Sequence, residues 1–295
     1  MNIKDNSAGS KIFDIVNLII LVVISLLCLL PLWYVLCVSL STKDAVNAGL
    51  VSFWPVGFNV DSYKKIVGEG AFFRAFWNSI CRVVLGTLVS LGCILMAAYP
   101  LSRTKAQFPK RNMFMWILIF CMLFNGGTVP WYLTMLKYKM IDNIWGLVLA
   151  GGLPVYNVIL AMNFFKNLPS ELEEAALVDG AGPWRIWASV YVPLAKPSIA
   201  TIALFTIVGY WNEFFQGLVL STKEASYPLQ TYIQQMVVTL DYSTMNAEQI
   251  AAASKLNNQS LDAAKIFIAM VPVLLVYPFL QKYFVKGITL GSVKG

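Results

Sequence analysis

Long apolar runs separated by short polar segments dominate the chain. The runs from Leu18 to Val38 and from Ile144 to Phe165 carry no charged residue. As helices, each is long enough to cross a hydrocarbon core of about 30 Å. A cleaved signal peptide is an alternative for the first run, but the apolar part is too long and lacks a small-residue cleavage site. We therefore expect retained membrane helices.

Apolar runs of about 20 residues predict an all-α integral membrane protein with six transmembrane helices. The third span is the least regular, because Asn125-Gly126-Gly127 and Pro130 interrupt it. Such a break is tolerated at membrane depth only where other helices or water satisfy the freed backbone groups. The predicted spans are Phe13–Val38, Asn78–Tyr99, Met113–Met135, Asn143–Phe165, Pro197–Leu220 and Ala263–Phe284.

Basic residues in a short loop predict the orientation. The loop Ser102–Asn112 contains Arg103, Lys105, Lys110 and Arg111 and no acidic residue. Short loops rich in lysine and arginine face the cytoplasm. With six spans, both termini and the loop between spans four and five are then also cytoplasmic, whereas Ser39–Trp77 and Ser221–Asp262 face outward.

The composition supports a membrane protein and excludes several kinds of site. The chain is 58% hydrophobic and 13% charged, against roughly 45–50% and 25% in soluble domains. It has no histidine, which excludes a Ser-His-Asp triad, imidazole metal sites and histidine proton relays. Its five cysteines form no C-x-x-C pair, so we expect no metal site. The net charge of +7 fits loops held against anionic lipid better than nucleic-acid binding.

A charged, glycine-punctuated segment stands between spans four and five. Glu171 to Pro193 reads ELEEAALVDGAGPWRIWASVYVP. Ser170 is a candidate N-cap, the glutamates complement a helix dipole, Gly180 can end the helix and Pro183 can start the next one. These signals predict a helix-turn-helix. From spacing alone, a docking surface and a plain amphipathic connection are equally good hypotheses.

The segment resembles the signature loop of bacterial binding-protein-dependent ABC importer permeases. Glu174-Ala175-Ala176 is followed after three residues by Gly180 and after nine more by Val190-Tyr191-Val192-Pro193. The family pattern has Ile and Leu where this chain has valines, which keeps the apolar character. The resemblance implies a cytoplasmic coupling loop over residues 166–196 whose first helix docks into a cleft on an ATPase subunit. The residues implied in this coupling are Glu174, Ala175, Ala176, Leu177, Asp179 and Gly180.

The resemblance covers almost the whole chain. The segment that begins FNGGTVPWYLTM, the WNEFF of span five and the tail YPFLQKYFVKGITLGSVKG are similar to the polysaccharide and oligosaccharide branch of the maltose-type carbohydrate permeases. This implies a single permease domain over residues 1–295, with a core at about 78–284, in a bacterial cell membrane. It also implies four partners: a second homologous permease, a cytoplasmic ATPase dimer with its ATP and Mg, an extracellular solute-binding protein and an oligosaccharide.

Span five carries the candidate substrate path. Glu213 is an acidic side chain inside predicted span five, and such acids usually face a bundle interior or a water-filled cavity. Aromatic rings, amides and carboxylates together suit a sugar. A purely structural role for Glu213, bonded to a neighbouring helix, is an almost equal alternative. The candidate path residues are Tyr210, Trp211, Asn212, Glu213, Gln216, Asn125 and Tyr156.

Two alternative functions for a membrane chain make different demands on the sequence. A membrane-embedded enzyme acting on lipid-linked sugars would need clustered carboxylates or histidines near one interface. An ion-coupled secondary transporter would need internal repeats and paired intramembrane acids. The chain also lacks G-x-x-x-x-G-K-[ST], so ATP hydrolysis must belong to a partner. The charge of the sugar stays open, because Arg82 and Lys265 could serve an anion or simply anchor a span.

Overall fold

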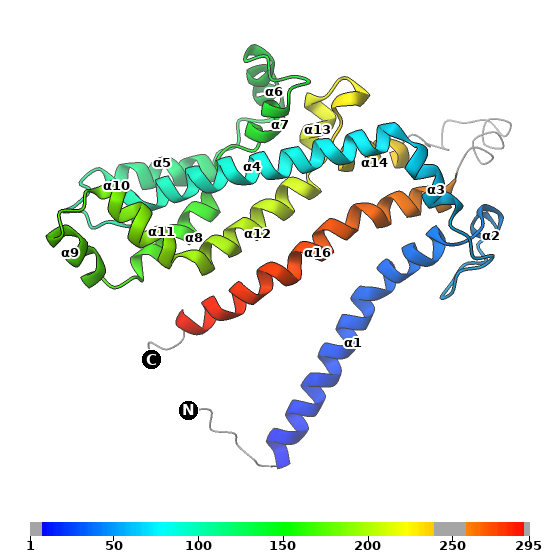
Figure 1. Cartoon of the computed structure of the whole chain (residues 1–295), viewed down its shortest axis with the longest axis horizontal. Coiled ribbons are helices and arrows are strands. Elements are labelled where there is room, and N and C mark those ends of the chain that lie inside the picture. Colours follow the sequence, from blue (N-terminus) through cyan, green and yellow to red (C-terminus); the bar gives the residue numbers. More distant parts are fainter. Residues whose placement is uncertain (1–7, 239–257, 292–295) are drawn as a thin grey trace. The chain divides into compact units, whose positions relative to one another are not determined.

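The structure is a computed structural model that describes residues 8–238 and 258–291. Within these ranges every regular element is helical, which confirms the all-α class (Figure 1). The elements are α1 (Ala8–Ser39), α2 (Lys43–Asn47), α3 (Asp61–Gly68), α4 (Gly70–Ser102), α5 (Arg111–Leu123), α6 (Thr128–Lys137), α7 (Ile144–Leu149), α8 (Val155–Lys166), α9 (Glu171–Val178), α10 (Pro183–Ile186), the π-helix η1 (Trp187–Tyr191), α11 (Val192–Leu194), α12 (Lys196–Asn212), α13 (Phe215–Leu220), the 3-10 helix η2 (Glu224–Ser226), α14 (Leu229–Val238) and α16 (Gln259–Gly291).

The chain divides into two compact units. The first comprises Met1–Glu69 and Met236–Met270, and the second comprises Gly70–Gln235 and Val271–Gly295. The single permease domain expected from the sequence stays a prediction.

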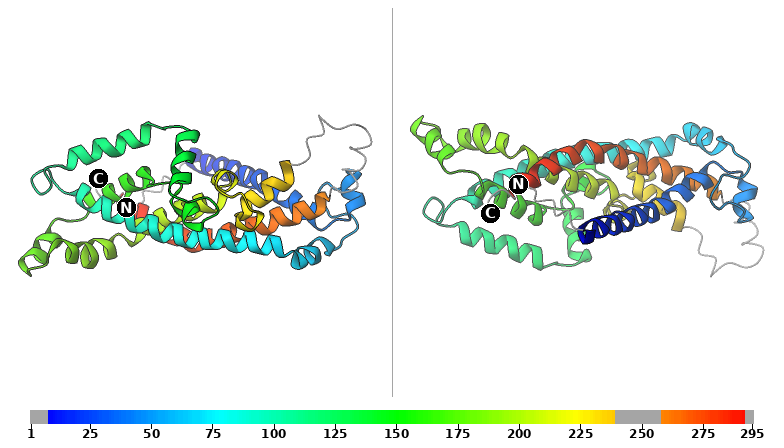
Figure 2. Two further views of the ribbon diagram at one scale, coloured as in Figure 1. Left: turned by 90° about the horizontal axis from the view of Figure 1, so that it is seen from above. Right: turned by 90° about the horizontal axis from the view of Figure 1, so that it is seen from below.

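Helix α4 is the centre of the second unit, and α12 and α8 pack along it in views at right angles (Figures 1 and 2). In its middle stretch the buried face is the more polar one: Ser79, Arg82, Gly86 and Ser90 recur at helical spacing on that face. The large apolar Leu88 of the same stretch is exposed instead. Membrane helices typically turn small and polar residues toward neighbouring helices and apolar residues toward the lipid. Close approach of the backbones then stabilises the packing, because lipid provides no hydrophobic driving force between helices.

An apolar cluster fixes the end of α4 that leads to Ser102. Ile94 and Ala98 of α4 meet Val158 and Phe165 of α8 and Ile202 of α12. Ile186 and Tyr191 belong to the same cluster. The segment that follows α9 is therefore packed onto the core of the helix bundle.

Unbroken helices account for part of the predicted spans. Three helices are long and apolar enough to cross a membrane: α1, α4 and the described start of α16. Two bent pairs could each add one more, α5 with α6 at 111° and the Pro183–Leu194 segment with α12 at 80°. The count of six spans stays a prediction.

Three predicted spans contain breaks. The third is interrupted between Leu123 and Thr128, at the Asn125 and glycine signal seen in the sequence. The fourth was expected to be one helix, but it is split into α7 and α8, which a Gly-Gly-Leu-Pro stretch ending at Pro154 separates. The fifth ends at Asn212, and α13 resumes only at Phe215. Proline and glycine explain the first two breaks because they disfavour a continuing helix.

The first unit has its own small core, formed by the end of α1, α2 and the start of α16. Ser260 donates to the carbonyl of Ser41 at 2.9 Å. Lys265 was expected to serve an anion or to anchor a span, but it is buried and its Nζ lies 2.6 Å from Glu69 Oε2. Its charge is thus balanced inside this unit.

Candidate functional site

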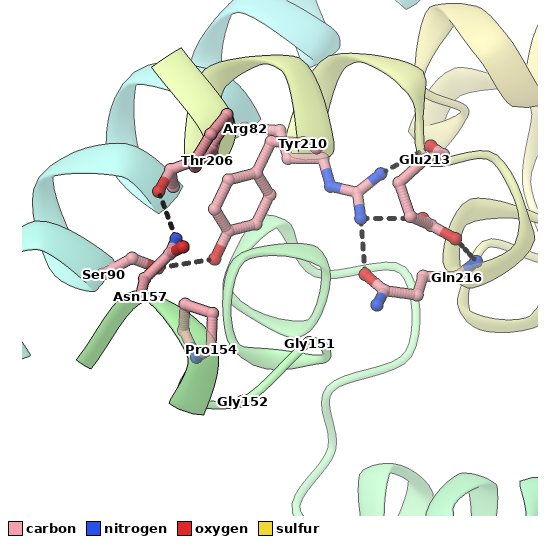
Figure 3. Close-up of a pocket in the computed structure, with 12 residues that line it drawn as sticks. Arg82, Ser90, Gly151, Gly152, Pro154, Asn157, Thr206, Tyr210, Glu213 and Gln216 are labelled. Carbon is pink, nitrogen blue, oxygen red and sulfur yellow. Dashed lines mark hydrogen bonds and ion pairs between the residues drawn. The ribbon is translucent and has the colours of Figure 1, made fainter. Parts of the chain in front are cut away.

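A cavity of about 180 Å³ lies in the second unit, between α4, the α7–α8 connection and the end of α12 (Figure 3). Polar side chains enter it from α4, α8, α12 and the junction of α12 with α13, whereas the α7–α8 connection contributes glycine and proline. The lining residues are Arg82, Ser90, Gly151, Gly152, Pro154, Asn157, Phe205, Thr206, Gly209, Tyr210, Glu213 and Gln216.

Arg82 connects the walls of this cavity. Its Nη2 donates to Glu213 Oε2 at 2.9 Å and to Gln216 Oε1 at 2.5 Å. Its Nη1 donates to the Glu213 carbonyl at 3.0 Å, and its Nε donates to the Leu147 carbonyl at 3.2 Å. The Arg82 side chain is 1% exposed and that of Glu213 is 25% exposed, so the pair is a largely buried one. A guanidinium with so many acceptors ties α4, α7 and the α12–α13 junction together.

Arg82 also provides a hydrogen bond to the backbone of Glu213. Glu213 follows the last residue of α12 in an extended conformation, with φ −76° and ψ 118°, so its carbonyl leaves the helical pattern. Arg82 bonds that carbonyl, and Glu213 Oε1 accepts the amide of Gln216 at 2.8 Å. Both bonds replace helical hydrogen bonds that the break removes.

A second set of polar bonds faces the same cavity from α4, α8 and α12. The Tyr210 hydroxyl donates to the Val148 carbonyl at 2.8 Å and lies 3.1 Å from Ser90 Oγ. Asn157 Nδ2 donates to Thr206 Oγ1 at 3.4 Å. Hydroxyls and amides of this kind could bond sugar hydroxyls.

The structure brings together three of the candidate path residues, Tyr210, Glu213 and Gln216, on the cavity wall. Trp211 is buried and packs edge-on against Phe76, with ring centroids 5.7 Å apart. Asn212 is exposed at the end of α12 and is not among the lining residues.

Asn125 and Tyr156 also lie away from the cavity lining. Asn125 sits in the break between α5 and α6, where its Oδ1 accepts the amide of Gly127 at 2.9 Å. Tyr156 is exposed on α8. The substrate path stays a prediction, and only part of the candidate set converges on one place.

Sequence reasoning missed Arg82 as the partner of Glu213. It was interpreted as an anion site or an anchor, whereas the structure buries it against that acid. A signal was present, because a single acid in a span needs a cation and Arg82 is the basic residue within predicted span two. Their separation of 131 positions along the chain hid the pairing.

The segment after α8 folds as its sequence indicates. Helix α9 covers Glu171–Val178, Gly180 turns the chain with φ +73°, and Pro183 begins α10. Ser170 does precede α9, but its side chain makes no cap hydrogen bond. A positive φ favours glycine because a Cβ would be strained there.

One face of this segment is open. Glu174, Ala175, Leu177, Asp179 and Gly180 are exposed, whereas Ala176 packs against the core cluster. Exposed large apolar side chains continue the surface, and the most exposed of them are Val178 at 88% and Trp184 at 73%. Neighbouring exposed apolar side chains of this kind often mark a site that a protein partner or a membrane covers.

The opposite face of α9 is charged and partly buried. Glu173 pairs with Arg103, which follows α4, and the Tyr191 hydroxyl donates to Glu173 Oε2 at 2.9 Å. Burial disfavours the charged guanidinium, but the bonds to Glu173 and Tyr191 outweigh it and raise the pKa of Arg103. Arg103 therefore stays charged at all physiological pH values.

Comparison with known proteins identifies the family. Residues 3–290 match the model of the binding-protein-dependent transport system inner membrane component. The chain belongs to this family. Because the match covers almost the whole chain, the prediction of an ABC importer permease is confirmed, and it is preferred over a membrane enzyme or an ion-coupled transporter.

Three relatives illustrate the similarity of this permease to known ones. Protein LplC of Bacillus subtilis (strain 168) is 37% identical, over 98% of this chain and 97% of that protein. The polygalacturonan/rhamnogalacturonan transport system permease protein YtcP of the same organism is 34% identical, over 97% and 99%. A chain in the crystal structure of a bacterial ABC transporter involved in the import of the acidic polysaccharide alginate is 35% identical, with a TM-score of 0.82, over 94% of this chain and 98% of that one.

Proposed function

We propose that this permease forms half of a heterodimeric pore for oligosaccharides, with a second homologous permease as the other half. ATP and Mg would bind to a cytoplasmic ATPase dimer, because this chain has no phosphate-binding loop of the G-x-x-x-x-G-K-[ST] type. An extracellular solute-binding protein would deliver the sugar. The observation that carries the proposal is the open surface of α9 and α10 on a chain of the importer-permease family.

The coupling role is assigned to this open surface. The small side chain of Ala175 allows close approach of another backbone, and Glu174 offers a carboxylate to a basic group beside it, whereas Ala176 packs against the core cluster. A groove on the ATPase that closes around α9 would move the helix with it. In this arrangement both termini, the loop Ser102–Asn112 and α9 lie on the cytoplasmic side.

The cavity beside Arg82 is proposed as part of the sugar path. It offers Tyr210, Gln216 and Asn157 as hydrogen-bonding groups, and its fixed charges, Arg82 and Glu213, balance each other. A volume of about 180 Å³ has room for one sugar ring rather than for a chain. The second permease would have to complete a path for an oligosaccharide.

Among sugars, acidic oligosaccharides are the first candidates. One relative is named for polygalacturonan and rhamnogalacturonan, and the solved relative for the acidic polysaccharide alginate. Neutral fragments are the alternative. Both kinds carry the hydroxyls that the cavity groups can bond.

Uptake by the whole complex tests the proposal. The permease, its partner permease, the ATPase and the binding protein are reconstituted in proteoliposomes and supplied with labelled oligogalacturonate or a neutral cello-oligosaccharide of equal length. We expect ATP-dependent accumulation of the acidic compound. Accumulation of the neutral compound alone would refute the acidic class, and purification without an ATPase subunit would refute the importer itself.

A further inference from the structure

Four side chains form a cluster where α4 ends, and this Arg103 cluster consists of Tyr99, Arg103, Glu173 and Tyr191. The Arg103 guanidinium carbon lies 4.8 Å from the ring centroid of Tyr99 and 4.4 Å from that of Tyr191. Its Nη1 forms the ion pair with Glu173. The two side chains of this ion pair are 11% and 13% exposed. The cluster joins α4, α9 and η1.

The contacts of the cluster hold its members in one arrangement. A planar guanidinium that contacts two aromatic rings keeps little rotational freedom, and its bond to a carboxylate is charge-assisted. Tyr191 also bonds Glu173 and packs edge-on against Phe165 of α8, at a centroid distance of 5.5 Å. Separating Arg103 from Glu173 would leave a mostly buried charge without its counter-ion, which is costly. Helix α9 is therefore attached to the end of α4 and not merely adjacent to it.

Helix α4 connects this cluster to the cavity, with Pro100 in its last turn and no proline between Tyr99 and Arg82. The same helix carries Ser90 and Arg82, which line the cavity, and Gly86, against which the Tyr210 ring packs. A helix is a stiff element, so a displacement of its end at Ser102 is passed along its length. A stiff element in contact with both sites offers a physical route for coupling between them.

Two adjacent glutamates of α9 thus have different surroundings. Glu174 is exposed on the face that is open to a partner, whereas Glu173 points into the Arg103 cluster. We propose that the ion pair of Glu173 with Arg103 is the positioning contact that transmits the movement of α9 to α4. This inference rests on the proposed coupling function and assigns it a residue pair outside the signature motif.

The test measures sugar transported per ATP hydrolysed in the same proteoliposomes. The variants are Arg103→Gln, Glu173→Gln and the double variant of the two. A fourth variant, Arg103→Lys, keeps the positive charge but loses the planar contact with the two tyrosine rings. Allosteric couplings typically amount to factors of roughly 5–150, so we expect each glutamine variant to lower transport per ATP by about fivefold or more. The double variant should be no worse than either single one, because residues that act through each other are not additive.

The matched control is Lys105→Gln, which removes an exposed cation from the loop that also holds Arg103. It should keep transport per ATP at the wild-type value, and all variants should retain the ATPase subunit on purification. If the pair were only structural, assembly and transport would fall together while transport per ATP stayed unchanged, and the inference would be wrong. It would also be wrong if the effects of the two single variants multiplied in the double one. A wild-type complex without an ATPase would instead refute the proposed function.

Discussion

At the scale of single residues, the central feature is a buried acid that pairs with a cation from another helix. Glu213 was singled out because a carboxylate at membrane depth needs a polar environment. Arg82 supplies it, with a contact of 2.9 Å to the side chain and another of 3.0 Å to the Glu213 carbonyl. The geometry thus shows one of the two alternatives for this residue, a bond to a neighbouring helix, and it also places Glu213 on the cavity wall. A place in the substrate path stays a prediction.

Replacement of Glu213 separates these two roles. Glu213→Ala leaves the Arg82 guanidinium buried without its main acceptor, and an unmet buried group of this kind costs about 1–3 kcal/mol or more. We therefore expect a lower melting temperature of the purified complex. We also expect the double variant Arg82→Gln/Glu213→Gln to be less destabilised than the sum of the two single variants. Additive losses in thermal melts would contradict the pairing.

Uptake per assembled complex then reports on the path itself. A charge-assisted hydrogen bond to a sugar hydroxyl contributes roughly 1.5–3 kcal/mol, so Glu213→Gln should lower uptake of a neutral sugar about tenfold. For an acidic sugar the same change removes a repulsion, and uptake should rise. Unchanged uptake per complex with both sugars would remove Glu213 from the transport path.

Gly86 is a second position where one side chain decides the packing. A Cβ built on Gly86 would lie 2.6–2.8 Å from atoms of the Tyr210 ring. Gly86→Ala must therefore displace the ring, at a cost of about 1–3 kcal/mol for overpacking. The displaced Tyr210 hydroxyl would lose its bond to Val148. We expect a lower melting temperature, whereas Gly92→Ala on the same helix, where the nearest atom is the flexible Met96 methyl at 3.7 Å, should keep it near the wild-type value.

At the scale of elements, the breaks in the helices contribute more to the cavity than the continuous helical turns do. The junction of α12 and α13 places Glu213 beside Arg82, and the connection between α7 and α8 contributes Gly151, Gly152 and Pro154 to the cavity. Continuous helices would hide these backbone groups in internal hydrogen bonds. The turn after α9 belongs to the same class of feature, because it decides how α9 is presented.

The turn at Gly180 can be tested without disturbing any packing. Gly180 has φ +73°, and a Cβ there would meet nothing within 4 Å. Gly180→Val therefore acts through the backbone, and a β-branched residue in the left-handed region costs about 1–2 kcal/mol or more. We expect Gly180→Val to lower both transport and ATP hydrolysis stimulated by the binding protein, while the permease still reaches the membrane.

The control is Gly182→Ala, since Gly182 is equally open but has φ −75°, which alanine adopts without strain. It should behave as wild type. Glu174→Lys adds an independent probe of the same surface, because it would place a like charge against a basic partner. Wild-type coupling in both Gly180→Val and Glu174→Lys would refute the role of this surface.

At the scale of the whole molecule, the orientation in the membrane connects the loops to their partners. The basic loop Ser102–Asn112 predicts a cytoplasmic side that includes α9. The ion pair between Arg103 of this loop and Glu173 of α9 supports placing both on the same side. The whole-chain family match makes the protein a multi-pass membrane permease, and its sidedness is the part left to measure.

Cysteine labelling in intact cells measures this sidedness. In a background where Cys28, Cys37, Cys81, Cys93 and Cys121 are replaced by alanine, Lys110→Cys should resist an impermeant reagent added outside. Lys223→Cys, an exposed position in the segment predicted to face outward, is the matched control and should be labelled. Ready labelling at position 110 would show that this loop faces outward. It would contradict the predicted orientation and, with it, the docking of α9 to a cytoplasmic ATPase.

Local chemistry is what the sequence by itself determined. Features that depend only on neighbouring residues could be predicted from the sequence. They are the charge-free runs, the interruption of the third span at Asn125, the α9 helix and the Gly180 turn. The motif around Glu174 likewise lies within one segment, and it was enough to indicate the family. Charge in the loops predicted an orientation for the same reason.

Only the tertiary structure decided which distant groups meet. Arg82 pairs with Glu213 at a separation of 131 positions, and Arg103 pairs with Glu173 at a separation of 70. Helical and strand periodicity relate only residues a few positions apart, so neither pairing could be predicted from the sequence pattern. The candidate path residues lie in different places for the same reason. Tyr210 lines the cavity, whereas its neighbour Trp211 packs against Phe76. Adjacent residues on a helix point in directions about 100° apart, and the neighbouring helices determine which of those directions leads to the cavity.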